Sequence, residues 1–271
     1  MVMKQWLNDD GNINLKMMQN AKQFFDQYTY YVDDLFLCQS ACSGLLSDIK
    51  QKQTEQVLPH VKRTIKGRSL DYRVMDGLFV KTHLPALIAL TPKVMRAANK
   101  LCDYELYPID NPSAVVNVNI TAKGGEYRWH YDRNAITAIL YLNQVQQGET
   151  ELIPNSRFHL GPLKHSCVQR WVDRRLIGKL NHTSNHALNH TRHQTNAVPG
   201  IVQVSPKPGR LMIMQGDRCL HSVNPVGSNI ERYNVIYTFD KKGARYPIDK
   251  HLDPYLYSLE KAPVFDPNYS A

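Results

Sequence analysis

The sequence predicts an α+β protein in which helices pack outside a double-sheet β-structure, either a sandwich or a jelly roll. Apolar residues recur at helical spacing in the first hundred or so residues, whereas from Pro112 onward short β-rich runs alternate with turn residues. The chain has 271 residues, of which 42% are apolar and 21% charged, which is enough to bury a substantial core. The longest apolar runs, such as Leu84–Leu90, are too short to cross a bilayer.

Helices are expected first. Residues 14–50 contain no proline and repeat apolar side chains at helical spacing. Asp33 and Asp34 precede a second apolar stretch, so this region is predicted to form two helices. Thr91 followed by Pro92 predicts the start of another helix, with Thr91 as the N-cap, that ends before Pro108.

Strands follow. Several carry the alternation of a half-buried sheet, as in Val116–Ile120. The predicted strands are Ala114–Ile120, Tyr127–Tyr131, Ala135–Leu142, Glu149–Ile153, Gly200–Ser205, Arg210–Gln215 and Tyr233–Phe239. The interval 158–197 is long, polar and rich in His and Asn, which is typical of a lid or binding loop. We therefore expect a mainly helical part over 1–110, a β-core over 111–245 with an insertion at about 158–197, and a C-terminal extension over 246–271.

The net charge of +9 is local. Between Asn155 and Arg210 there are nine basic residues and one acid, so this segment alone carries 9 − 1 = +8. Such a concentration of charge predicts an anionic partner. The five cysteines show no disulfide framework, and the first residues, MVMKQWLNDDGN, lack the apolar stretch of a secretory signal. We expect free thiols, a cytoplasmic location and no membrane association, and the sequence leaves the oligomeric state open.

A candidate metal site lies in the segment GEYRWHYD, residues 125–132. His130 and Asp132 are two residues apart, so on a strand they face the same side and can hold one metal ion. His221, just beyond the apolar strand Arg210–Gln215, could supply a third ligand. Two histidines and one carboxylate leave open positions, the arrangement of non-haem Fe(II) oxygenases. Arg232 follows His221 by eleven residues, and its guanidinium could bind a carboxylate of a cosubstrate.

From about Ser113 to Asp240 the chain resembles the 2-oxoglutarate- and Fe(II)-dependent dioxygenases, in particular the prolyl-4-hydroxylase-like branch. The resemblance rests on GGEYRWHYD, TAILYLN, GETELIP, PKPGRLMIM, CLHSVNPV and ERYNVIYTFD, in that order. It implies a double-stranded β-helix core of the jelly-roll, cupin-like type. It also implies that His130, Asp132 and His221 bind Fe(II), that 2-oxoglutarate and O2 are cosubstrates, and that ascorbate stimulates. Arg232 would then bind the C5 carboxylate of 2-oxoglutarate.

The same resemblance implies which residues lie beside the C5 carboxylate of 2-oxoglutarate. Tyr141 matches a tyrosine that in some members hydrogen-bonds this carboxylate, and Thr121 stands where another tyrosine is often found. Members that halogenate have a small residue in the place of Asp132, so its presence favours hydroxylation of an unactivated C–H bond, or a derived dealkylation or desaturation, with succinate and CO2 as co-products. No catalytic residue is expected beyond the metal centre.

Three substrate classes remain open. We prefer an anionic small molecule of metabolite or natural-product biosynthesis, bound by Arg170, Trp171, Arg174 and Arg175 under the insertion as a mobile cover. The alternative is a peptidyl, prolyl-type hydroxylase. A nucleic-acid oxidative demethylase ranks last, because Thr238 stands where that branch has a second arginine and because dense Lys/Arg runs are absent.

The histidines of the insertion offer a weaker signal. His182, His186 and His190 are spaced for one helix face, but the Asn, Ser and Thr residues around them favour caps and turns. We expect solvated loop histidines rather than a second metal site.

Overall fold

The computed structural model describes residues 15–64, 69–157, 167–187, 200–244 and 252–257. Helices in these ranges are α1 (Leu15–Tyr28), α2 (Gln39–Glu55), α3 (Gly77–His83), α4 (Pro85–Asn99), α5 (Cys167–Ala187) and α6 (Leu252–Tyr257). The strands are β1 (Tyr30–Asp33), β2 (His60–Thr64), β3 (Ser69–Met75), β4 (Leu106–Pro108), β5 (Val116–Thr121), β6 (Tyr127–His130), β7 (Ile136–Tyr141), β8 (Thr150–Ile153), β9 (Val202–Val204), β10 (Leu211–Gln215), β11 (Leu220–Val223) and β12 (Arg232–Lys241).

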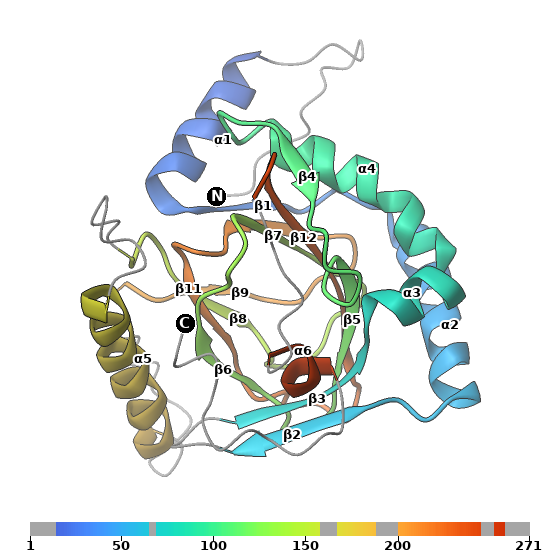
Figure 1. Cartoon of the computed structure of the whole chain (residues 1–271). Coiled ribbons are helices and arrows are strands. Elements are labelled where there is room, and N and C mark those ends of the chain that lie inside the picture. Colours follow the sequence, from blue (N-terminus) through green and yellow to red (C-terminus); the bar gives the residue numbers. More distant parts are fainter. Residues whose placement is uncertain (1–14, 65–68, 158–166, 188–199, 245–251, 258–271) are drawn as a thin grey trace.

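All of these strands belong to one antiparallel sheet with the order β1-β10-β7-β12-β5-β3-β6-β11-β8-β9, with β2 paired to β3 and β4 to β12. The sheet curls round, so that β6, β8 and β11 lie opposite β5 (Figure 1). β3 joins the two sides, because Leu70 pairs with Tyr127 of β6. The result is the predicted α+β jelly roll, with helices α1 to α4 on the outside.

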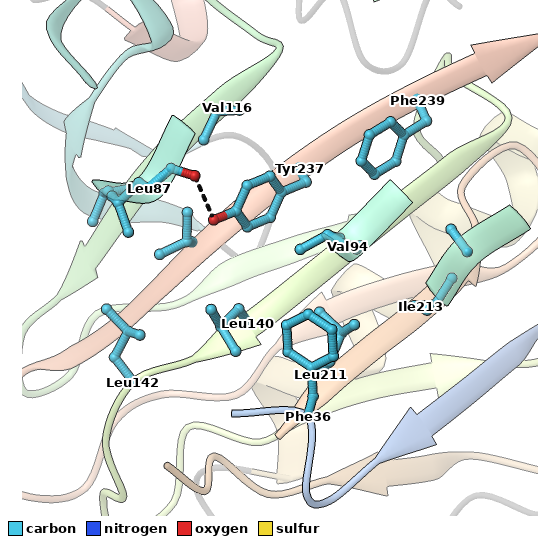
Figure 2. Close-up of a cluster of buried hydrophobic side chains, with 14 of the residues drawn as sticks. Phe36, Leu87, Val94, Val116, Leu140, Leu142, Leu211, Ile213, Tyr237 and Phe239 are labelled. Carbon is cyan, nitrogen blue, oxygen red and sulfur yellow. Dashed lines mark hydrogen bonds between the residues drawn. The ribbon is translucent and has the colours of Figure 1, made fainter. Parts of the chain in front are cut away.

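The largest core lies between these helices and the outer face of β5, β7, β10 and β12. Alternation along β5 decides which side chains enter it: Val116, Val118 and Ile120 join the core, whereas the residues between them face the inside of the barrel. Figure 2 shows part of this core, where the Tyr237 hydroxyl donates a hydrogen bond of 3.0 Å to the Leu87 carbonyl. The buried hydroxyl is thereby satisfied without interrupting the apolar packing.

The N-terminal part differs from the prediction, because it contributes β1, β2, β3 and β4 to the sheet. The two helices expected within residues 14–50 are present, but Thr29 with φ 59° ends the first one and turns the chain into β1. The predicted helix start at Thr91 is wrong. Pro85 occupies the first turn of α4, and Pro92 lies inside that helix.

Two further segments depart from the expectation. The strand β11, which carries His221, was not predicted as a strand. The insertion, predicted as a loop, contains the 21-residue helix α5. Its segments 158–166 and 188–199 lie outside the described residues, and so does His190. In the described part of the chain, no helix is long and apolar enough to span a bilayer.

Candidate metal centre

Neighbouring strands bring the three predicted metal ligands together. β6 and β11 pair antiparallel, with His130 directly opposite His221. The imidazole centroids are 4.0 Å apart, and Asp132 follows β6 by two residues. Its Oδ1 lies 3.5 Å from Nε2 of His130 and 3.6 Å from Nε2 of His221. One ligand atom from each residue therefore lies within 4.8 Å of the others, close enough to bind one ion.

Backbone carbonyls fix the orientation of both imidazoles. Nδ1 of His130 lies 2.9 Å from the Arg128 carbonyl, and Nδ1 of His221 lies 3.0 Å from the Cys219 carbonyl. Since a carbonyl only accepts, each Nδ1 must carry the proton, and each Nε2 lone pair points to the centre. Burial, with a smaller contribution from His130, lowers the pKa of His221 to about 4, so this ring is neutral at pH 7. Both rings thus have the tautomer that a metal requires.

Asp132 is held by contacts that leave Oδ1 facing the histidines. The Thr137 hydroxyl donates to Oδ2 over 2.5 Å, and the Asp132 amide donates to the Gly216 carbonyl over 2.9 Å. Burial alone would raise the pKa of Asp132, but the charge that His221 and His130 can carry outweighs it and lowers the pKa to about 2. The carboxyl is therefore ionised. Gly216 is required here, because a Cβ would lie 2.7 Å from that of Asp132.

The three ligands line a cavity of about 120 Å³ that also contains Arg232. Arg232 is 1% exposed, and its Nη1 and Nη2 donate to Asn234 (2.5 Å) and Thr150 (3.1 Å). Its Nε has no hydrogen-bond partner, and no carboxylate of the described residues forms an ion pair with it. Burial lowers the pKa of Arg232, but an arginine remains charged near neutral pH. A buried cation that lacks a counter-ion favours an anionic ligand in this cavity.

The structure brings the other predicted cosubstrate residues close to Arg232. Thr121 pairs with Arg232 across β5 and β12 and lines the cavity. Tyr141 lies beneath: its ring centroid is 5.3 Å from the Arg232 guanidinium carbon, and its hydroxyl is 2.7 Å from the Thr150 hydroxyl. Sequence reasoning missed Thr150 and Asn234, although Asn234 has a visible signal, since it is a polar residue two positions after Arg232 on the same face of a strand.

Three of the four predicted substrate residues of the insertion, Trp171, Arg174 and Arg175, are not brought to the cavity. Ile177 of α5 packs against Trp129 and Leu220, whose side chains face away from the metal ligands that follow them in β6 and β11. The helix therefore covers the outer side of these strands, as Figure 1 shows at the left. Trp171 is 55% exposed, with the Arg175 guanidinium over its ring. Arg170 and Arg174 belong to the same helix. Trp171, Arg174 and Arg175 do not line the cavity, and the side chain of Arg170 lies outside the described part of the structure.

The C-terminal extension instead contributes to the cavity. Leu256 and Tyr257 of α6 line it, and in Figure 1 this helix lies at the mouth of the barrel beside β3. The Tyr72 hydroxyl donates to the Leu256 carbonyl over 3.0 Å, and Arg63 Nε donates to the Tyr255 carbonyl over 2.9 Å. These bonds attach α6 to the hairpin formed by β2 and β3.

Solved structures share this fold. The epimerase SnoN, in complex with Fe3+, alpha ketoglutarate and nogalamycin RO, aligns over 93% of this chain and 95% of its own, with a TM-score of 0.63 and 12% identity. HygX from Streptomyces hygroscopicus, with nickel and 2-oxoglutarate bound, aligns over 84% and 88%, with a TM-score of 0.57 and 10% identity. A prolyl-4-hydroxylase of Pseudomonas putida aligns over 83% and 100%, with a TM-score of 0.51 and 15% identity.

No protein-family model and no curated protein sequence matches the chain. At such low identities the structural likeness establishes the fold. It confirms the predicted jelly roll and agrees with the family resemblance in the sequence.

Proposed function

We propose that this chain is a non-haem Fe(II)- and 2-oxoglutarate-dependent oxygenase that oxidises an unactivated C–H bond of a small molecule. The observation that carries the proposal is one cavity that holds both a His–Asp–His group and a buried guanidinium that forms no ion pair with a carboxylate of the described residues. A metal and a carboxylate-bearing cosubstrate would satisfy both features at once.

His130, Asp132 and His221 fit Fe(II) by the chemistry of their donor atoms. Two imidazole nitrogens and one carboxylate oxygen face the same point, and three protein ligands leave positions for a chelating cosubstrate and for O2. Structural zinc sites instead use four ligands and often thiolates. Within the described part of the chain, no cysteine joins this group.

When bound, Fe(II) with 2-oxoglutarate and O2 supplies the oxidising power, and succinate and CO2 are the co-products. The protein would bind and orient the metal and the cosubstrate and shield them from water. Arg232 offers a fork of N–H donors to the distal carboxylate, and its bonds to Thr150 and Asn234 hold the guanidinium in place. Thr137 orients Asp132, and Leu256 and Tyr257 of α6 line the cavity.

A small-molecule substrate is supported by solved structures that share this fold. SnoN and HygX have been crystallised with the small molecules nogalamycin RO and hygromycin B, respectively. The positive charge of the insertion was the reason to expect an anionic substrate. The structure weakens this reason, because the described basic residues of the insertion lie on α5, outside the barrel.

The proposal is tested by measuring succinate formed by Fe(II)-loaded protein in air with 2-oxoglutarate. We expect slow succinate formation without substrate that requires both Fe(II) and 2-oxoglutarate, and its loss in His221→Ala. His60→Ala is the matched control, since this histidine is half exposed and does not line the cavity. Equal succinate formation in wild type and His221→Ala would refute the assignment.

A further inference from the structure

One wall of the cavity carries hydrogen-bonding side chains to which the proposed function assigns no role. Asn117 and Asn119 of β5 and Thr238 of β12 line it. Asn117 donates one long bond of 3.5 Å to the Ala114 carbonyl. Within the described residues, the side chains of Asn119 and Thr238 form no hydrogen bond. Buried and half-buried amides rarely remain unsatisfied, so this wall has unused capacity for a polar ligand.

An aromatic wall stands beside these amides. The rings of Tyr72 and Tyr127 are stacked with centroids 5.3 Å apart, and the Tyr127 ring lies 4.4 Å from that of His130. Leu256 and Tyr257 of α6 extend this surface. A ligand between the two walls would therefore have a flat apolar side and a hydrogen-bonding side, next to the candidate metal centre.

The charges around this space do not suit an anion. The ionisable groups of the lining, apart from the tyrosines, are His130, Asp132, His221, Arg232 and Glu126. The first three bind the metal in the proposed function, and Arg232 binds the cosubstrate. Glu126 accepts hydrogen bonds at Oε1 from the amide and hydroxyl of Ser69 and offers no positive charge. Burial raises the pKa of Tyr72 and Tyr127, so both phenols stay neutral. Arg128 acts on Tyr72 and Tyr127 from behind the aromatic wall and does not line the cavity. Among the described lining residues, a carboxylate or phosphate would lose its hydration without meeting a cation other than Arg232.

We propose that this space binds an uncharged, amide- or hydroxyl-bearing part of the substrate, with Asn117 and Asn119 as its hydrogen-bonding partners and α6 as its outer wall. This inference rests on the proposed function and names the substrate class of the same site. It replaces the expected recognition of an anion by the insertion. Leu256 and Tyr257 then act as specificity residues, because they limit the length of the group that fits.

The test uses three probes of one shape and different charge: benzamide, benzoate and benzylamine. The full chain is loaded with Mn(II), saturated with 2-oxoglutarate, and mixed with each probe, whose proton relaxation is measured by NMR. Zn(II)-loaded protein is the diamagnetic reference, so extra relaxation reports binding close to the metal. Calorimetry on the same sample first checks that metal and 2-oxoglutarate bind. Failure of that step would refute the proposed function, whereas success there with no benzamide binding would refute only this inference.

We expect benzamide to bind and benzoate to bind about tenfold more weakly or not at all. In Asn117→Leu/Asn119→Leu, benzamide affinity should fall about tenfold, since the amides are lost and their volume is kept. Asn229→Leu, the same change at an exposed loop position, should have no effect. Asn119→Lys, which tests the idea even if the double variant does not fold, should reverse the preference towards benzoate. Stronger binding of benzoate or benzylamine than of benzamide by the wild type would overturn the inference.

Discussion

The substitution Arg232→Met tests two effects of the buried Arg232 charge separately: its effect on stability without 2-oxoglutarate and its effect on 2-oxoglutarate binding. Without 2-oxoglutarate, the wild type holds a guanidinium that is 1% exposed and has no carboxylate partner among the described residues. Removing a buried charge that has no ion-pair partner also removes its desolvation penalty, which offsets the lost hydrogen bonds to Asn234 and Thr150. With 2-oxoglutarate, the same substitution removes the proposed partner of the distal carboxylate. We therefore expect an unchanged or higher melting temperature in the variant, but loss of the response to cosubstrate.

The expected loss of 2-oxoglutarate affinity and the expected shift in melting temperature follow from the burial of the Arg232 charge. Removing one partner of a buried, hydrogen-bonded charge pair costs about 3–5 kcal/mol, which weakens 2-oxoglutarate binding by roughly two to three and a half orders of magnitude. For the wild type, ligand at about 100 times its dissociation constant adds about 2.7 kcal/mol of stability. In a chain of this size that corresponds to a rise of roughly 5–10 °C in melting temperature.

The assay is thermal unfolding of metal-loaded protein with and without 2-oxoglutarate, supported by calorimetric titration. Arg232→Lys serves as the second variant, because it keeps the charge but loses the planar fork, so its affinity should lie between those of wild type and Arg232→Met. Equal stabilisation of wild type and Arg232→Met by 2-oxoglutarate would refute the reasoning. A large drop in melting temperature of the ligand-free variant would also contradict it.

Three further substitutions test the supporting contacts. Thr137→Val removes the hydrogen bond to Asp132 and should lower metal affinity about 10–100-fold in a metal titration. Gly216→Ala should weaken metal binding in the same titration, because the new Cβ would displace Asp132. If the variant binds metal with wild-type affinity, the backbone at Gly216 can shift to accommodate the Cβ, and the prediction is wrong. Ile177→Ala should cost about 2–5 kcal/mol in denaturant unfolding, through lost packing on Trp129, and should leave metal affinity unchanged. A loss of metal affinity in that variant would place α5 closer to the site than described.

The cluster of His130, Asp132 and His221 could be predicted because part of its signal is local. His130 and Asp132 follow from the alternation of side chains near a strand end, and the family resemblance supplies His221 and Arg232 by their order in the chain. The direct pairing of His130 with His221 could not be predicted. It depends on the register of β6 and β11, and β11 is too short for its pattern to show as a strand.

The surroundings of the site were harder to predict, because they depend on which face of an element is covered. The insertion contained a visible signal, since Leu176, Ile177 and Leu180 have the spacing of one helix face, but its many polar residues favoured a loop. Its charge suggested a cover over the site, yet the apolar stripe packs on the outer side of β6. The helix α6 has six residues, too few to show any periodicity, and its role becomes visible only through its contacts with β2 and β3.

The central claim is that His130, Asp132 and His221 form one iron site that makes 2-oxoglutarate binding possible. The most direct measurement is an anaerobic titration of metal-free protein with Fe(II) followed by calorimetry with 2-oxoglutarate. We predict one Fe(II) per chain, one 2-oxoglutarate bound after the metal, and orders-of-magnitude weaker Fe(II) binding in Asp132→Ala. The account would be contradicted by Fe(II) binding of wild-type strength in Asp132→Ala, or by a wild-type protein that binds no Fe(II).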